Sequence, residues 1–186
     1  MLLETKNLWL KTTEMQDSIK LHENFWSDAK TAEGMLWKPS QTIQESEKKL
    51  KTMLQTKETL FFTLIKKETK EPIGLLTITK NKKSDKIIDN IGFGFSAKET
   101  HKGYGLEVLF IAIEFCFNKL LVDEVNVSYL KNIGVSDNIN KVFGFVQSEK
   151  GETQIKKKHT GEKLDVVNLT LSKQRWEMQK QRLRGH

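Results

Sequence analysis

The chain has 186 residues, of which 37% are hydrophobic and 30% charged, with only 2 prolines and 11 glycines. This composition is typical of one soluble globular domain and not of a disordered chain. The formal net charge of +7 attracts polyanions, but it does not choose between nucleic acid, an acidic substrate and a phosphorylated cofactor.

Cysteine content and apolar runs set the expected location. The single cysteine, Cys116, cannot form a disulfide within the chain, so a reducing, cytoplasmic compartment is expected. Glu4 and Lys6 interrupt the N-terminus, which argues against a signal peptide. The longest apolar stretch, Val108–Phe117, is half of the roughly 20 residues that a membrane-spanning helix needs, so no membrane partner is expected.

Hydrophobic periodicity predicts the elements in chain order. Alternating apolar residues predict a strand at 7–12. Apolar residues at three- and four-residue spacing predict a helix from Met15 to Trp26, and a second helix from the capping box of Thr42 and Glu45 to Lys57. Runs rich in β-branched residues then predict strands at 60–66, 72–80 and 87–96.

The second half of the chain begins with the most strongly periodic segment. Further predictions are a helix at 105–119, a strand at 125–129, a short helix between Ser136 and Gly144, a strand from Phe145, a charged turn at 151–163 and a last strand at 164–171. This order predicts an α/β fold with a mixed sheet and helices on both faces. We expect one domain over residues 1–173 and a polar, basic tail over 174–186 that frays.

The most informative segment is Thr100–Glu107, where two glycines lie between a strand and a strong helix. Free amides at a helix N-terminus bind anions, and Gly103 and Gly105 let a phosphate approach them. Lys102 adds positive charge. The alternative is a tight strand-to-helix turn without a ligand. A dinucleotide fingerprint fails because Val108 replaces its third glycine, and a P-loop fails because no Gly-Lys-Ser/Thr follows.

The same segment resembles the acyl-CoA motif of the GCN5-related N-acetyltransferase (GNAT) superfamily, in which Gln or Arg precedes Gly-x-Gly. Here the motif reads Thr100-x-x-Gly103-x-Gly105, after the glycine-bearing strand Ile91–Phe95. Together with Asn132, Ser136 and Gly144-Phe145, it looks especially like the branch of the ribosomal-protein alanine N-acetyltransferases. The resemblance covers nearly the whole chain and implies a GNAT-like, mostly antiparallel sheet.

The resemblance also implies roles for individual residues. Acetyl-CoA would be the co-substrate, with its pyrophosphate on the amides of His101, Lys102, Gly103, Tyr104 and Gly105. Its pantetheine arm would follow the backbone of Phe93, Gly94 and Phe95, and Asn132 would contact the cofactor. Ser136 would supply a catalytic hydroxyl near the sulfur, although Ser136 is equally suited to cap the short helix. Trp37 and Trp26 lie in the segment that covers the acceptor in this family.

The general base is left open by the sequence. Thr100 replaces the usual Gln or Arg of the motif, and Asn90 stands where many relatives carry a glutamate that accepts a proton. The candidates are Asp89, Glu124, Glu107, His22, His101 and ordered water. Four histidines without paired spacing predict no metal.

Three functions compete at this point. The leading hypothesis is an N-acetyltransferase that acts on a protein N-terminus, a small amine or an aminoglycoside-like compound, as a monomer or homodimer. A degenerate family member that binds CoA or a partner without catalysis is the alternative, because of Thr100 and Asn90. A nucleic-acid module is the third, from the net charge and the tail Lys180–Arg184, but no nucleic-acid motif accompanies it.

Overall fold

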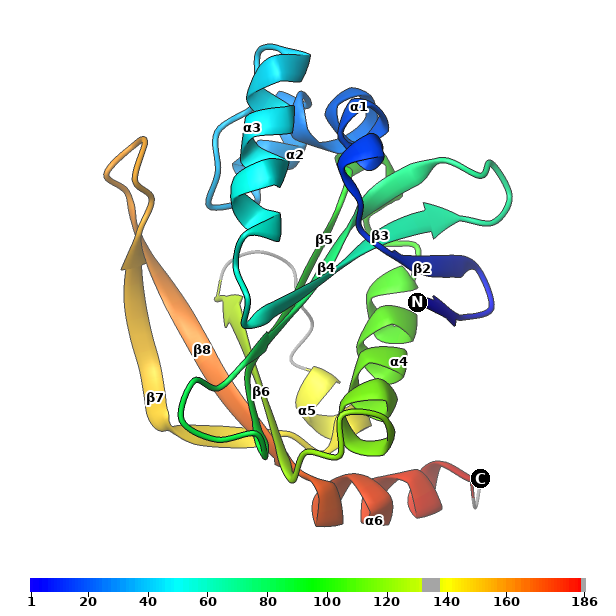
Figure 1. Ribbon diagram of the computed structural model, residues 1–186. Coiled ribbons are helices and arrows are strands. Elements are labelled where there is room, and N and C mark those ends of the chain that lie inside the picture. Colours follow the sequence, from blue (N-terminus) through cyan, green and yellow to red (C-terminus); the bar gives the residue numbers. More distant parts are fainter. Residues whose placement is uncertain (132–137, 185–186) are drawn as a thin grey trace.

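The computed structural model of the chain describes residues 1–131 and 138–184. An eight-stranded sheet runs through the molecule in the order β1-β2-β3-β4-β5-β6-β8-β7. Among the described strands, β5 and β6 form a parallel pair, and the other pairs are antiparallel. The strands are β1 Leu2–Glu4, β2 Leu8–Thr12, β3 Thr59–Lys66, β4 Pro72–Lys80, β5 Ile87–Phe95, β6 Glu124–Leu130, β7 Val146–Lys156 and β8 Lys163–Ser172. The predicted mixed, mostly antiparallel sheet is confirmed (Figure 1).

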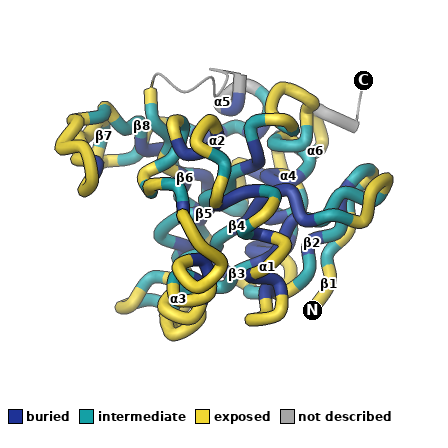
Figure 2. The backbone as a smooth tube through the Cα atoms, turned by 90° about the horizontal axis from the view of Figure 1, so that it is seen from above, coloured by how far each residue is buried: buried dark blue, intermediate teal, exposed yellow. Residues whose placement is uncertain are grey.

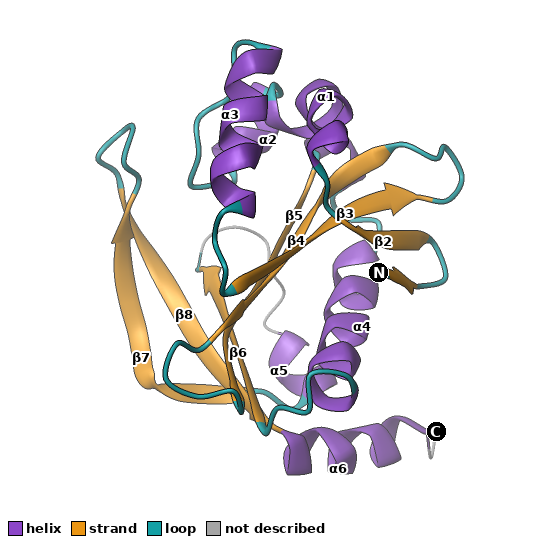
Figure 3. Cartoon of the chain, viewed as in Figure 1, coloured by secondary structure: helices purple, strands orange, loops and turns teal. Residues whose placement is uncertain are grey.

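Helices cover both faces of this sheet (Figure 3). The helical elements are η1 Met15–Asp17, α1 Ser18–Leu21, η2 His22–Trp26, α2 Ala29–Glu33, α3 Ile43–Leu54, η3 Ala97–Glu99, α4 Tyr104–Asn118, α5 Asn138–Phe143 and α6 Lys173–Arg184. The helix predicted from Met15 to Trp26 is divided into a 3-10 turn, an α turn and a π turn. The Thr42 side chain caps α3 by accepting from the amide of Glu45, as the capping box predicts.

Adjacent residues of β4 show how the two faces are filled. Leu76 belongs to the main core, which α4 covers, whereas Leu75 packs with Leu21, Trp26 and other residues of the smaller helical layer. Successive side chains of a strand point to opposite faces, so one strand supplies both layers. Figure 2 shows α4 as the most deeply buried helix and α3 as largely exposed.

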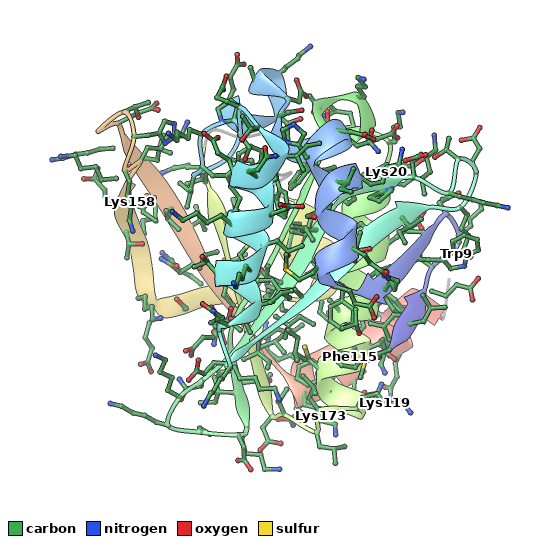
Figure 4. The ribbon with its side chains drawn as sticks, turned by 45° about the horizontal axis from the view of Figure 1, so that its top comes forward. Trp9, Lys20, Phe115, Lys119, Lys158 and Lys173 are labelled. Atoms are coloured by element: carbon green, nitrogen blue, oxygen red, sulfur yellow. The ribbon has the colours of Figure 1, made fainter. Side chains whose placement is uncertain are left out.

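The main core has an aromatic centre between α4 and the sheet. Phe115 of α4 meets Phe62 of β3 edge to face, with ring centroids 5.7 Å apart. Figure 4 shows Phe115 in this central position, whereas Lys158 lies at the β7–β8 turn. Edge-to-face packing of this kind adds to the area-dependent stabilisation of the core.

The C-terminal segment differs from the predicted fraying tail. Residues Lys173–Arg184 form helix α6, and Trp176 of this helix is completely buried. Its ring stacks on Phe143 at 6.1 Å, and its indole N–H donates to the carboxylate of Glu114 on α4. A single aromatic anchor therefore orders a segment whose overall composition is polar and basic.

Strand β7 is longer than predicted, because the charged segment after Gly151 continues the strand to Lys156. Gly151 has φ +58° and lies in a bulge, where the register shifts between Gln147 and Glu152. The amide of Asn168 on β8 donates to the Gly151 carbonyl and to Thr153 Oγ1, both at 2.9 Å. The glycine is thus a bulge residue stabilised from the neighbouring strand, and the turn begins only at Lys157.

Candidate active site

The two halves of the sheet separate at the parallel pair β5 and β6. Pairing runs from Ile87 and Glu124 to Ile91 and Val127, with a register shift before the last pair. Beyond it, β5 stays paired with β4 and β6 stays paired with β8. The two strands therefore diverge beyond this pair, on the side of the sheet where α2 lies, and we call this divergence the wedge (Figure 3).

Asn90 lies at the point where the strands part. Its side-chain oxygen accepts a hydrogen bond of 2.9 Å from the backbone amide of Ser128. On the other side of the bulge, the Asn126 amide donates to the carbonyl of Ile88 at 3.0 Å. Hydrogen bonds of the Asn90 and Asn126 side chains thus replace backbone pairing between β5 and β6 at this point. The separation of the two strands is therefore stabilised by specific residues.

The strand-to-helix connection at the end of β5 exposes a run of free amides. His101 and Gly103 adopt left-handed backbone angles, with φ of +61° and +83°. Within the described residues, the amides of residues 101–105 have no hydrogen-bond acceptor, whereas the Leu106 amide donates to the Gly103 carbonyl at 3.2 Å. Unpaired amides at the start of the 15-residue helix α4 suit an anionic group such as a pyrophosphate.

The two glycines of this motif have different structural reasons. Gly103 needs its positive φ, while a Cβ at this position would meet no atom of the described residues within 4 Å. Gly105 is helical, and a Cβ there would lie 3.3 Å from Cε2 of Phe93. The first glycine therefore serves the backbone conformation, and the second lets α4 approach β5 closely.

Two lysines near the free amides of residues 101–105 are partly neutralised by neighbouring glutamates. Lys102 forms an ion pair of 2.9 Å with Glu99, and the ammonium of Lys66 lies 3.8 Å from the same carboxylate. Lys66 also pairs with Glu68 at 2.8 Å. An incoming phosphate would therefore compete with Glu99 for the two lysines.

Aromatic packing fixes the end of β5. The rings of Phe93 and Phe95 lie 5.8 Å apart, and Tyr104 of α4 lies 6.1 Å from Phe95. A Cβ on Gly94 would collide with Met35, which covers this part of the strand. Contact between β5 and a ligand is thus limited to the backbone edge that faces the wedge.

Helix α2 is joined to both sides of the wedge. On one side, Thr31 Oγ1 accepts from the amide of Ala97 at 2.8 Å, just after β5. On the other side, the ammonium of Lys157, in the β7–β8 turn, donates to the carbonyl of Glu33 at 3.0 Å. No sequence pattern indicated these contacts, because a lone threonine and a lone lysine belong to no motif.

The two tryptophans predicted to cover an acceptor surround a lysine of the chain. Trp26 is only 1% exposed and belongs to the helical layer, whereas Trp37 is partly exposed. The Lys49 ammonium lies 5.5 Å from the ring centre of Trp26 and 4.7 Å from that of Trp37. Burial lowers the pKa of Lys49, although the charge of Glu45 opposes the shift. Both rings thus contact the ammonium group of Lys49, a residue of the chain itself.

Two of the predicted site residues, Asn132 and Ser136, lie outside the described residues. Among the base candidates, Glu107 accepts from the backbone amide of Asn7 at 3.1 Å, which joins α4 to the β1–β2 turn. Burial raises the pKa of Glu107, but hydrogen bonds from Thr5 and Asn7 outweigh it and leave the pKa lowered. Such a carboxylate is a structural acceptor.

The remaining candidates divide by position. His22 Nδ1 lies 2.9 Å from Ser46 Oγ and joins η2 to α3. Asp89 and Glu124 line a groove beside β5 and β6.

Burial raises the pKa of the Cys116 thiol to about 12, so this residue is no nucleophile at neutral pH. No group of three potential metal ligands occurs among the described residues.

Comparison with known proteins identifies the class to which this fold and wedge belong. The profile of the family described as "Acetyltransferase (GNAT) domain" matches residues 7–146. The chain therefore belongs to the GNAT acetyltransferase family, which transfers acetyl groups from acetyl-CoA to amines. No curated protein sequence matches the chain. The helices of the described residues are each too short or too polar to span a lipid bilayer.

Solved structures share the fold at low sequence identity. A GNAT-family acetyltransferase from Bacillus anthracis has a TM-score of 0.74 and 17% identity, with 94% of this chain and 99% of that chain covered. The ribosomal-protein-S5-alanine acetyltransferase from Vibrio fischeri has 0.73 and 13%, with 95% and 98% covered. Spermidine N-acetyltransferase from Vibrio cholerae, in complex with CoA and spermine, has 0.74 and 15%, with 92% and 98% covered.

Proposed function

We propose that this protein is an active N-acetyltransferase that moves an acetyl group from acetyl-CoA to a primary amine. The observation that carries the proposal is the wedge between β5 and β6, which leads directly to the free amides of residues 101–105. A long, flexible ligand with an anionic end fits this combination of a backbone edge and an anion site.

In this proposal, the amides of residues 101–105 hold the pyrophosphate of acetyl-CoA. Lys102 and Lys66 add charge beside it, once Glu99 gives way. The pantetheine arm lies along the backbone of Phe93–Phe95, so the thioester reaches the wedge near Asn90 and Ser128. The absence of a side chain at Gly105 keeps α4 close to this strand.

The reaction is a direct attack of the neutral amine on the thioester carbonyl. The C–N bond forms, the C–S bond breaks, and the amine loses a proton while the leaving thiolate gains one. We propose that Ser136 protonates the thiolate and that Asn132 contacts the cofactor. Asn90 accepts from the Ser128 amide and is no base, so Asp89, Glu124 or water would take the amine proton.

The acceptor is either a protein N-terminus or a small-molecule amine. The motif supports the ribosomal-protein alanine branch, and the Vibrio fischeri structure has a similar fold. The spermidine N-acetyltransferase shows that the same fold also serves a small polyamine. A cytoplasmic location is part of the proposal, in keeping with the buried free thiol of Cys116.

Isothermal titration of the full chain with acetyl-CoA tests the proposal, followed by an amine panel with thiol release as readout. We expect binding at about micromolar Kd, which corresponds to about −8 kcal/mol, and turnover on at least one amine. Absence of acetyl-CoA binding would contradict the proposal.

A degenerate, non-catalytic protein is the second candidate, favoured by Asn90 and Thr100. Asn90 is engaged by Ser128, and the Thr100 hydroxyl donates to the Ala97 carbonyl at 2.9 Å. Neither side chain is therefore free in this structure to replace the residue usual in the family. Acetyl-CoA binding without turnover on peptides and small amines alike would favour this candidate.

A further inference from the structure

Glu99 places a carboxylate at the edge of a site that is suited to anions. It is the last residue of the 3-10 turn η3, two residues before the free amides of residues 101–105 begin. Its Oε2 atom lies 2.9 Å from the ammonium of Lys102 and 3.8 Å from the ammonium of Lys66, at the end of β3. The chain's own carboxylate thus pairs with the two lysines that the proposed function assigns to a phosphate.

Hydrogen bonds hold the turn on which Glu99 lies. The Glu99 amide donates to the carbonyl of Ser96 at 2.9 Å, and the Thr100 hydroxyl donates to the carbonyl of Ala97, also at 2.9 Å. The Ala97 amide donates in turn to Thr31 Oγ1 of α2 at 2.8 Å. The backbone from which the Glu99 side chain projects is therefore fixed by the fold.

Partial burial distinguishes Glu99 from the other carboxylate beside Lys66. The Glu99 side chain is 15% exposed and the Lys66 side chain 14%, whereas the Glu68 side chain is 75% exposed. Solvent and salt screen a partly buried charge less than an exposed one. Glu99 therefore keeps its effect on the two lysines, while Glu68 loses much of its own effect to the solvent.

A phosphate at the free amides needs what Glu99 already holds. Lys102 is part of the run of residues that carries these amides, and its ammonium is paired with Glu99. For the lysine to serve the phosphate, the ion pair must be broken or shared, and this costs part of the new attraction. The site therefore binds an anion more weakly than the same amides with two free lysines would.

A different role for Glu99 would be to orient the two lysines toward the phosphate. The geometry argues against this role, because one oxygen atom, Oε2 of Glu99, contacts both ammonium groups. The point on which Lys66 and Lys102 converge is thus already occupied by an anionic group. A carboxylate in that position competes with a phosphate.

We propose that Glu99 is a positioning residue that limits the affinity of the site for CoA, by holding Lys102 and Lys66 on its own carboxylate. The inference rests on the proposed function for the identity of the ligand. Substrate and product carry the same phosphates, so Glu99 weakens the binding of both and makes the release of CoA easier. Tighter binding of both would not lower the barrier of the acetyl transfer itself.

Titration of the full chain at low salt with acetyl-CoA, and separately with CoA, tests the inference. Glu99→Gln keeps the size of the side chain and removes its charge. We expect both ligands to bind about tenfold more tightly, a difference of about 1.4 kcal/mol, and to show a steeper loss of affinity with salt.

Glu58→Gln is the matched control, because it makes the same change of charge just before β3, at the opposite end of the strand from Lys66. The eight residues between them span roughly 26 Å, at about 3.3 Å per residue. The affinity of this control for acetyl-CoA should stay within about twofold of that of the unsubstituted protein.

A double-mutant cycle tests whether Glu99 acts through Lys102. Lys102→Gln should weaken acetyl-CoA binding by about twofold in the unsubstituted protein, where Glu99 holds the lysine. The same change should weaken it by about tenfold in the Glu99→Gln variant, where the lysine is free. Equal losses in the two backgrounds would overturn the inference.

Unchanged acetyl-CoA binding in Glu99→Gln would also overturn it, whether or not thermal unfolding changes. Weaker binding would do the same, because Glu99 would then orient the lysines for the phosphate. Failure of acetyl-CoA to bind both the unsubstituted protein and Glu99→Gln would instead refute the proposed function. Inorganic pyrophosphate then decides the inference alone: it should bind Glu99→Gln more tightly, and equal binding would overturn the inference.

Discussion

At the scale of single residues, the site depends on positions where a side chain is missing or engaged. Gly103 supplies a left-handed backbone angle, and Gly105 supplies close contact with Phe93. Asn90 is engaged by Ser128, so the residue that departs from the family pattern has a structural role at the wedge. Each role depends on one local contact, so single substitutions can test it.

Substitution of Gly103 tests the backbone conformation of the anion site. Gly103→Ala should lower the free energy of unfolding by about 1 kcal/mol, because φ is +83° there, and should also weaken acetyl-CoA binding. Calorimetry and titration measure the two effects. Gly161→Ala is the control, since Gly161 has φ +76° in the β7–β8 turn, away from the amide run. Equal affinities in both variants would argue against this site.

At the scale of elements, the ends of the chain are held by a few apolar contacts. Helix α6 depends on Trp176, which contacts Phe110 and Phe143 and donates to Glu114. Met178 on this helix is exposed and adds little burial, while Lys180 adds an ion pair of 3.0 Å with Glu114. Trp176 is therefore the main apolar anchor of the described part of α6.

Replacement of Trp176 by alanine measures the contribution of this side chain to the free energy of unfolding. Trp176→Ala should lower the free energy of unfolding by about 3 to 5 kcal/mol, because it opens a large cavity and removes the indole donor to Glu114. Met178→Ala, at a residue 52% exposed, should change it by less than about 0.5 kcal/mol. Urea unfolding followed by circular dichroism gives both values. Similar effects of the two substitutions would show that α6 is not anchored in this way.

At the scale of the whole molecule, α2 connects the two half-sheets across the wedge. Thr31 joins it to the end of β5, and Lys157 joins it to the β7–β8 turn. Thr31 also donates to Asp28, and this hydrogen bond is the main reason why the pKa of Asp28 is lowered. Thr31 thus links α2, the end of β5 and a titrating group.

Replacement of Thr31 tests this link through stability and pH. Thr31→Val should lower the free energy of unfolding by about 1 to 3 kcal/mol, since it leaves the partly buried Ala97 amide unpaired, and Thr31→Ser should restore most of it. The contribution of Asp28 is present above its ordinary pKa of 3.8 and is lost as pH falls below that value. The midpoint temperature of thermal unfolding, measured from neutral to acidic pH, should therefore fall less steeply below pH 3.8 in Thr31→Val than in the unsubstituted protein. An identical slope would refute this linkage.

The sequence by itself determined the order of most elements and the glycine motif, because periodicity and turn chemistry are local properties. Strand β4 and the α3 cap followed directly from neighbouring residues. The predictions differ from the structure where a distant residue decides the outcome. The Asn168 side chain stabilises the bulge at Gly151 by a hydrogen bond. Contacts with Glu114 and Phe143 position Trp176 of α6.

The tertiary structure alone decided how the site is assembled. The wedge needs Asn90 and Ser128 from separate strands, and the placement of α2 needs Thr31 against Ala97. The groove that Asp89 and Glu124 line is formed by residues of several strands. The sequence placed Asp89 and Glu124 near the chemistry but could not give their direction. Residues 35 positions apart become neighbours only when β5 and β6 pair, and no local pattern encodes which face they share.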